Sequence, residues 1–232
     1  MPFRRRYNVR KRRRRYYPRR RKDTVKKVRR TVNKIKRKIE TKNYVVFHDA
    51  INVGATNTGI GNLQPGVSDN DVTSSGFIGK SYHCNGLAIQ GICFKRNASN
   101  VNSASFRMIC IWIKNVPIAG TVDFEDYYQT LDDQGTPATI PDFHAFLRPS
   151  QVKNVKILMD HKWSFGPKSS ANDVTSSPTQ FTFKRYLPIN GPTNVDVVTT
   201  NLTRGFLGIW LIADADDQVQ TSFTTKLYYK DP

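Results

Sequence analysis

The sequence predicts an all-β fold: a single eight-stranded antiparallel jelly roll of two packed sheets, preceded by a partly helical N-terminal arm rich in Arg and Lys. Two observations predict this division. Residues 1–42 contain 22 of the 37 basic and two of the 18 acidic residues, so this arm carries +20 and residues 43–232, the body, carry −1. After Lys42, short runs of β-branched and aromatic residues alternate with loops rich in Gly, Pro, Asn, Asp and Ser, which is typical of strands.

Residues 1–22 are the most basic part of the arm. Arg outnumbers Lys there, and Tyr16 and Tyr17 are interleaved with the basic residues. Such a segment repels itself and cannot bury a core, so we expect it to stay disordered until a polyanion neutralises it. Guanidinium groups bind phosphates with forked hydrogen bonds, and tyrosine rings stack on unpaired bases, which favours single-stranded nucleic acid as the partner. The candidate contact residues are Arg4, Arg5, Arg6, Arg10, Lys11, Arg12, Arg13, Arg14, Arg15, Tyr16, Tyr17, Arg19, Arg20, Arg21 and Lys22.

Residues 23–40 predict a basic amphipathic helix. Apolar β-branched residues recur at alternating spacings of three and four, and Asp23 occupies the N-cap position. The stripe is compatible with binding along nucleic acid, with packing against copies of itself, and with lying on an anionic membrane. It lacks the Trp, Phe and Leu that insert into membranes, so we expect no membrane insertion. The stripe is Val25, Val28, Val32, Ile35 and Ile39, and the candidate nucleic-acid contacts are Lys26, Lys27, Arg29, Arg30, Lys34, Lys36, Arg37 and Lys38.

Two clusters in the arm, Arg10–Arg15 and Arg19–Lys22, also match the pattern of a nuclear localisation signal. The match is unspecific, because any arm of this composition produces it. Nuclear import is therefore a hypothesis that the composition permits.

Eight strands are predicted after Lys42. The last alternates strictly, which places one face in a core and the other in water. By contrast, residues 106–113 are apolar on both faces, which predicts a strand covered by the core on one side and by something else, such as another subunit, on the other. The predicted strands are residues 44–51, 84–95, 105–114, 154–163, 180–187, 195–200, 206–213 and 219–229.

The connections between these strands are long. Roughly 30 residues separate the first two strands and nearly 40 separate the third and fourth, where residues 123–130 predict a short helix. Such crossovers favour a jelly roll, and the absence of a Cys…Trp…Cys spacing disfavours an immunoglobulin-like sandwich. We expect residues 52–80 and 116–151 at the surface, and a hairpin turn at residues 214–217 between the last two strands.

The body shows no catalytic signature, so we expect neither an enzyme nor a cofactor. Its three cysteines have no C-x-x-C spacing and fall in predicted strands, which indicates buried, reduced thiols. Its histidines form no H-x-x-x-H pair. Asp214, Asp216 and Asp217 offer the hard oxygen ligands of a weak calcium candidate, and a simple turn explains them as well.

Three segments of the body together form a recognisable pattern: an R-φ-φ-φ-φ-W strand, a long loop, and a V-x-I-L-x-D-x-x-W strand. They are Phe106–Pro117 (FRMICIWIKNVP), Pro141–Pro149 (PDFHAFLRP) and Asn154–Pro167 (NVKILMDHKWSFGP). With a basic arm in front, this pattern resembles the capsid proteins of small circular single-stranded DNA viruses that encode a Rep protein, the circovirus-like viruses. It is also similar to the coat protein of satellite tobacco necrosis virus. Lys114-Asn115 stands where the pattern usually has an acidic residue.

The resemblance implies a capsid protein with a single jelly roll that assembles into a sixty-subunit, T=1 icosahedral shell, with the arm facing inward onto the genome. Sixty such arms would supply about 1,200 positive charges, which neutralises a single strand on the order of one to two thousand nucleotides. The implied partners are identical subunits, single-stranded DNA bound without sequence specificity, host nuclear import receptors and cell-surface attachment factors. The implied locations are the virion and, during assembly, the host nucleus.

Two other functions fit parts of the sequence. A cellular nucleic-acid-binding protein of the ribosomal type also has a basic tail, but such proteins commonly carry basic residues over the folded part as well. A jelly-roll lectin fits the fold but gives no reason for the arm. The body charge of −1 therefore favours the capsid protein.

Overall fold

The computed structural model shows a chain that divides into two units, residues 1–39 and 40–232, and each is described by itself. In the first unit, residues 25–28 and 30–31 are helical. The residues that the structure describes are 25–28, 30–31, 41–61, 63–65, 81–96, 103–116, 122–130, 140–166, 180–195, 202–216 and 219–230.

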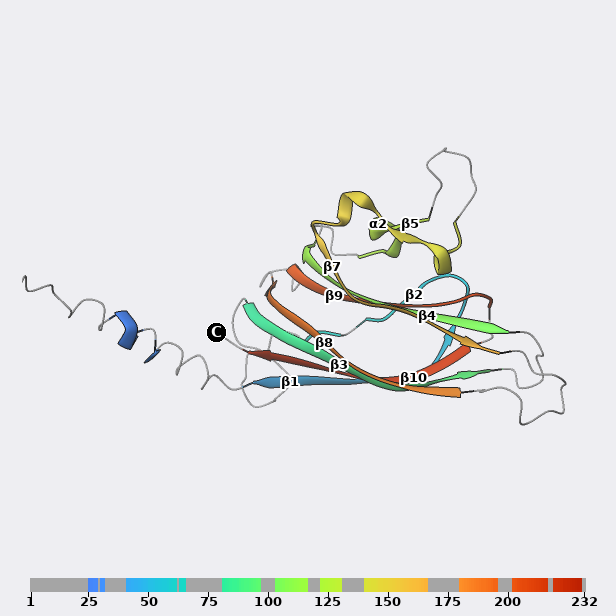
Figure 1. Ribbon diagram of the computed structural model, residues 1–232, viewed down its shortest axis with the longest axis horizontal. Helices are drawn as coiled ribbons and strands as arrows, with labels where there is room; N and C mark the ends of the chain where they lie inside the picture. The colour runs from blue at the N-terminus through green and yellow to red at the C-terminus, as the bar shows by residue number, and fades with distance from the viewer. Residues whose placement is uncertain are drawn as a thin grey trace, which may run out of the picture. The chain divides into compact units, whose positions relative to one another are not determined.

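The second unit is a jelly roll, in which an eight-stranded antiparallel sheet folds over into two layers (Figure 1). One layer has the strand order β1-β10-β3-β8 and the other β2-β9-β4-β7. The layers are joined where Asn194 and Val195 of β8 pair with Arg204 and Leu202 of β9. The predicted fold class is confirmed. The strands are β1 (Lys42–Val53), β2 (Thr58–Gly59), β3 (Ser81–Lys95), β4 (Ala104–Asn115), β7 (Val155–Phe165), β8 (Gln180–Val195), β9 (Leu202–Ala213) and β10 (Val219–Lys230).

Seven of the eight predicted strands lie where the sequence pattern placed them, and most extend further. β8 continues to Val195, well beyond its predicted end at Leu187. Of the strand predicted at residues 195–200, only Val195 is described, and it ends β8. The eighth strand of the jelly roll is β2, whose two residues are too few to leave a periodic pattern in the sequence.

A hydrophobic core fills the space between the two layers. β10 contributes every second side chain from Val219 to Tyr229, as its alternation predicts. The three cysteines are buried and unpaired, which confirms the expected thiols. Burial raises the pKa of Cys84 to about 12 and also raises the pKa values of Cys93 and Cys110. These thiols therefore stay protonated and unreactive at neutral pH.

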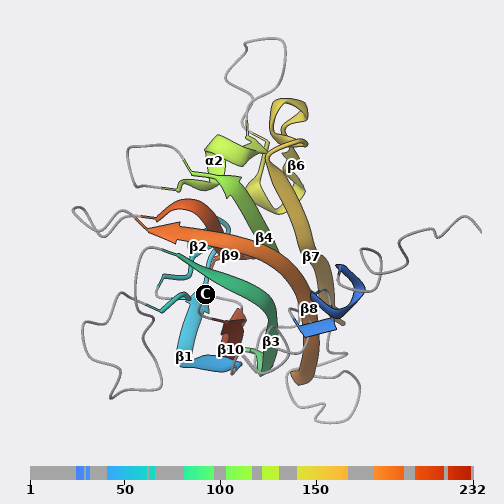
Figure 2. The same ribbon diagram turned by 90° about the vertical axis from the view of Figure 1, so that its left-hand side faces the viewer.

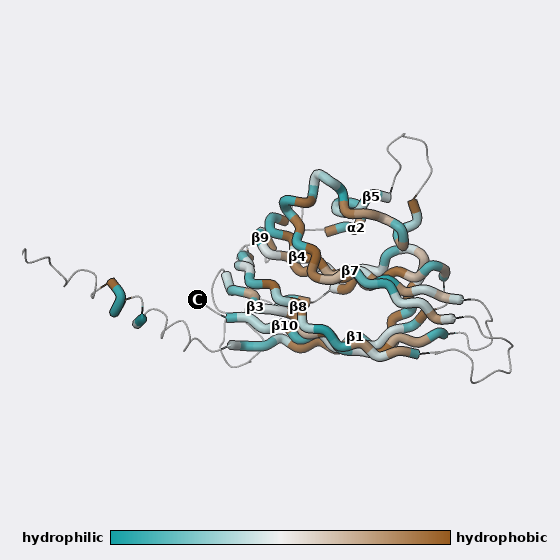
Figure 3. The backbone as a smooth tube through the Cα atoms, viewed as in Figure 1, coloured by the Kyte–Doolittle hydropathy of each residue, from teal (hydrophilic) through white to brown (hydrophobic). Residues whose placement is uncertain are grey.

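The outer face of β4 and β9 is covered by the chain between β4 and β7, here called the cover segment (residues 122–130 and 140–151). Ile109 and Ile111 of β4 and Trp210 of β9 pack there with Phe124 and Tyr127. β4 is brown, or hydrophobic, along much of its length in Figure 3. The second apolar face of residues 106–113 is thus covered by the same chain and not by another subunit. The cover elements are α2 (Phe124–Tyr127), inside the predicted short helix, β5 (Tyr128–Gln129), η1 (Asp142–His144), β6 (Phe146–Leu147) and η2 (Pro149–Gln151).

Arg107 fastens the cover segment to the sheet. Its Nε and Nη2 donate hydrogen bonds to the two carboxylate oxygens of Asp160 on β7, at 2.8 and 2.7 Å. Its Nη1 donates to the carbonyl oxygens of Asp142, Phe143 and Ala145, at 3.3, 3.0 and 2.9 Å. The three segments that share the capsid pattern therefore meet at this buried guanidinium group.

The chain enters the jelly roll at one of its two ends, here called the entry end. β1 starts there at Lys42, opposite Tyr229 of β10, and β4 ends and β7 starts at the same end, which faces the viewer in Figure 2. The connection after β9, which includes Asp214 and Asp216, lies at the opposite end. It links the two layers, because β9 and β10 pair with different neighbours. The predicted hairpin turn at residues 214–217 is therefore wrong.

Candidate nucleic-acid interface

The described part of the arm is helical and carries three of the predicted contacts, Lys26, Lys27 and Arg30. Val25 and Val28 of the apolar stripe are 56% and 55% exposed, so the described residues leave this part of the stripe uncovered. The other predicted contacts and both nuclear-localisation clusters lie outside the described residues: Arg4, Arg5, Arg6, Arg10, Lys11, Arg12, Arg13, Arg14, Arg15, Tyr16, Tyr17, Arg19, Arg20, Arg21, Lys22, Arg29, Lys34, Lys36, Arg37 and Lys38.

The weak calcium candidate contains a carboxylate that is used within the chain. Oδ1 of Asp216 accepts the Ala55 amide hydrogen at 2.7 Å, which ties the connection after β9 to the connection after β1. Asp217 lies outside the described residues, and the described part of the chain contains no group of three or more metal-ligating side chains. The hydrogen bond of Asp216 supports a role in this connection.

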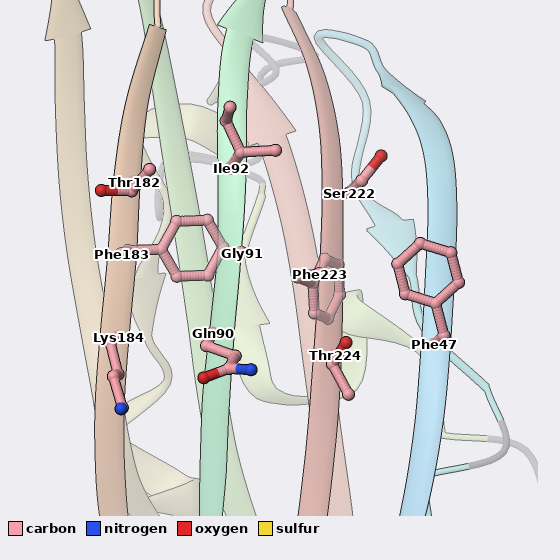
Figure 4. A pocket seen from close by; sticks show the side chains of 10 residues that line it. All are labelled: Phe47, Gln90, Gly91, Ile92, Thr182, Phe183, Lys184, Ser222, Phe223 and Thr224. Atoms are coloured by element: carbon pink, nitrogen blue, oxygen red, sulfur yellow. The ribbon is translucent and has the colours of Figure 1, made fainter.

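The open face of the β1-β10-β3-β8 layer mixes aromatic, polar and basic side chains. Figure 4 shows one row across its four strands, Phe47, Thr224, Gln90 and Lys184, which pair in register. Phe47 is 63% exposed. A broad hollow of about 770 Å³ extends over this row. Small-molecule sites are concave and bury most of their ligand, so this open face is better suited to contact with a large partner.

A smaller pocket of about 280 Å³, here called the entry-end pocket, lies at the entry end. Its charged lining residues are all basic: Lys114 of β4, Lys156 of β7 and Arg204 of β9. The Lys114 ammonium group donates to the Lys153 carbonyl oxygen at 2.7 Å. The Arg204 side chain has no partner among the described residues. The remaining lining residues are Trp112, Ile189, Asn190, Gly191 and Pro192.

A bulge in β8 shapes one wall of this pocket. The register between β3 and β8 shifts there, and Asn190 adopts the left-handed conformation, with φ 53°. Nζ of Lys156 donates to the carbonyl oxygens of Pro188 and Ile189, at 3.0 and 3.1 Å. Lys156 therefore holds the bulge in place and retains a third ammonium proton for a ligand.

Trp112 is buried in another wall, with 3% of its surface exposed. The edge of its indole ring lies against Gly191 and Gly205: a Cβ at these positions would approach the ring to 2.8 and 2.7 Å. Larger residues would therefore clash at both positions. The indole N–H has no hydrogen-bond partner among the described residues and is not fully buried, so it is accessible from the pocket.

The entry-end pocket cannot be predicted from the sequence, because its basic residues come from three strands that are distant in the chain. None of them belongs to a local motif. The available signal was Lys114, the basic residue at the point where the capsid pattern usually turns acidic. Only the strand register shows that Lys156 and Arg204 lie beside Lys114.

No protein-family profile matches the sequence, and no curated protein matches it. Among solved structures, a chain of Desmodium yellow mottle tymovirus is similar, with a TM-score of 0.31 and 9% sequence identity over 83% of this chain and 88% of that chain. The jelly-roll assignment rests on the strand order of this chain. Within the described residues, no helix is long and apolar enough to span a membrane.

Proposed function

We propose that this chain is a viral capsid protein, whose jelly roll forms a shell from identical copies and whose basic arm holds the packaged nucleic acid. The observation that carries the proposal is a complete jelly roll of charge −1 joined to an arm of charge +20. Closely packed copies of a body without net charge repel one another little. The arm then supplies the positive charge that neutralises the phosphates of the nucleic acid.

The finer details of the proposal follow from the three segments that share the capsid pattern. They support a sixty-subunit T=1 shell that packages single-stranded DNA without sequence specificity. In this proposal the protein is located in the virion and, during assembly, in the host nucleus. Nuclear import receptors and cell-surface attachment factors are its proposed host partners, and it has no enzymatic activity and no cofactor.

Size-exclusion chromatography and electron microscopy of the purified full-length protein test this proposal. We expect closed particles of uniform diameter at physiological salt, with co-purified nucleic acid that nuclease identifies as DNA or RNA. A ribosomal-type protein or a lectin would elute as a monomer or a small oligomer. A monomer under every salt and pH condition tested would refute the capsid proposal.

A further inference from the structure

We infer that the entry-end pocket binds a phosphodiester group of the packaged strand. The inference rests on the proposed function and adds a fixed contact on the jelly roll to the diffuse contacts of the arm. The pocket lies in the body, whose net charge of −1 gives no hint of an anion site. Three observations carry the inference: the sign of the charges, the unused hydrogen-bond donors, and the position at the entry end.

The charges around the pocket are of one sign. Lys114, Lys156 and Arg204 line it from three different strands, and no Asp or Glu is among its lining residues. Like charges gathered around one hollow create a positive potential that a bound anion relieves. Arg107, by contrast, has a carboxylate partner, Asp160, at 2.7 Å. The entry-end pocket lacks such a partner in its lining and therefore favours an anionic ligand.

The pocket also offers several donors and few acceptors of hydrogen bonds from its side chains. The Arg204 guanidinium group and the Trp112 indole N–H have no partners among the described residues, and Lys156 uses two of its three protons. A set of donors without a carboxylate suits a tetrahedral oxyanion, whose oxygens accept several hydrogen bonds at once. Phosphate esters and sulfate esters share this chemistry.

The position of the pocket favours a phosphodiester over a sulfated sugar. The arm is covalently joined to β1, and β1 begins at the entry end. A strand that is bound to the arm is thereby held near this end at a high effective concentration, on the order of millimolar for a short linker. Even a weak phosphate site would then be occupied.

Thermal unfolding of the full-length protein separates this pocket from the arm. The arm carries its charge whether or not the jelly roll is folded, so an oligonucleotide bound to the arm alone leaves the unfolding equilibrium unchanged. A ligand bound to the folded pocket raises the melting temperature. With thymidine tetranucleotide at about ten times its dissociation constant, we expect a rise of about 3–5 °C.

Substitutions of the basic residues that line the pocket test the inference. Lys114→Gln/Arg204→Gln should lose this rise, and Arg204→Gln alone, which breaks no described contact, should lose about half of it. The matched control is Lys184→Gln/Lys226→Gln, which removes the same charge from the open face of β8 and β10 and should keep the full rise. Light scattering confirms that the tetranucleotide does not cause assembly during the measurement.

Several outcomes would overturn the inference. No rise in the wild-type protein, or an equal rise in Lys114→Gln/Arg204→Gln, would show that the pocket binds no phosphodiester. A larger rise in melting temperature with a heparin tetrasaccharide than with the tetranucleotide would assign the pocket to a sulfated sugar. A rise with inorganic phosphate but not with the tetranucleotide would assign it to free phosphate. Failure of the capsid proposal is a separate result, because particles would then be absent by electron microscopy.

Discussion

At the scale of single residues, Arg107 shows how one buried charge organises a surface layer. The residue is only 4% exposed, and its side chain donates to a carboxylate and to three backbone carbonyl oxygens. Burying a charge costs several kcal/mol, which only such complete pairing offsets. Without Arg107, the Asp160 carboxylate and the carbonyl oxygens of the cover segment would lose their donor.

We expect Arg107→Met to lower the free energy of unfolding by about 3–5 kcal/mol, because removing one partner of a buried pair leaves the other unpaired. Urea unfolding followed by tryptophan fluorescence measures the change. The double variant Arg107→Met/Asp160→Leu should recover part of the loss, and Arg185→Met, at an exposed position of β8, should stay within about 0.5 kcal/mol of the wild type. An unchanged urea midpoint for Arg107→Met would contradict this role.

The buried thiols predict how stability depends on pH. Burial raises the pKa of Cys84 from 9.0 to about 12, so above pH 9 the unfolded chain releases a proton that the folded chain keeps. The free energy of unfolding should therefore fall as the pH rises from about 9 to 12, by up to about 1.4 kcal/mol per pH unit for each such thiol. Urea unfolding at pH 7, 9 and 10.5 tests this expectation. Stability that is constant up to pH 10.5 would contradict it.

At the scale of elements, the cover segment completes the burial of β4 on both faces over residues 106–113. Ile109, Ile111 and Ile113 face the cover, while Met108 and Cys110 face the core between the layers. Phe124 stacks on Tyr128, with ring centroids 4.7 Å apart, and meets Trp210 edge-on. The cover therefore extends the hydrophobic core to the outer side of this layer.

Two phenylalanines of the cover segment form a matched pair for testing this role. Phe124 is buried, and Phe146 is 75% exposed. We expect Phe124→Ala to lower the free energy of unfolding by about 3–5 kcal/mol, because it opens a cavity against Trp210. Phe146→Ala should change it by less than about 0.5 kcal/mol. Equal effects in thermal or urea unfolding would show that the cover does not pack as described.

The sequence predicts those features of the fold that depend on local patterns. Alternation in residues 219–229 predicts both β10 and its buried face, and the apolar run at residues 106–113 predicts that β4 is covered on both faces. The identity of the cover depends on contacts between distant segments, which periodicity does not encode. The same reason hides β2, whose register comes from β9, and the entry-end pocket, which exists only once β4, β7, β8 and β9 are side by side.

At the scale of the whole molecule, the net charge is divided between the arm and the body. The arm carries +20 and the body −1, so the contact with a polyanion and the contact between copies are assigned to different parts of the chain. The entry-end pocket adds a second, smaller site of positive charge in the body. It has three cations, whereas the arm has a net charge of +20. The arm therefore supplies most of the affinity for phosphates.

The salt dependence of DNA binding, with and without residues 1–42, tests this division most directly. For a single strand of about 60 nucleotides, the logarithm of the binding constant should fall with the logarithm of the salt concentration with a slope of about −14 for the full-length protein. The truncated body should stay folded by circular dichroism and show a slope no steeper than about −2, from the three cations of the pocket. A truncated body that keeps the full-length slope would show that the folded domain holds the nucleic acid, and the division of charge proposed here would be wrong.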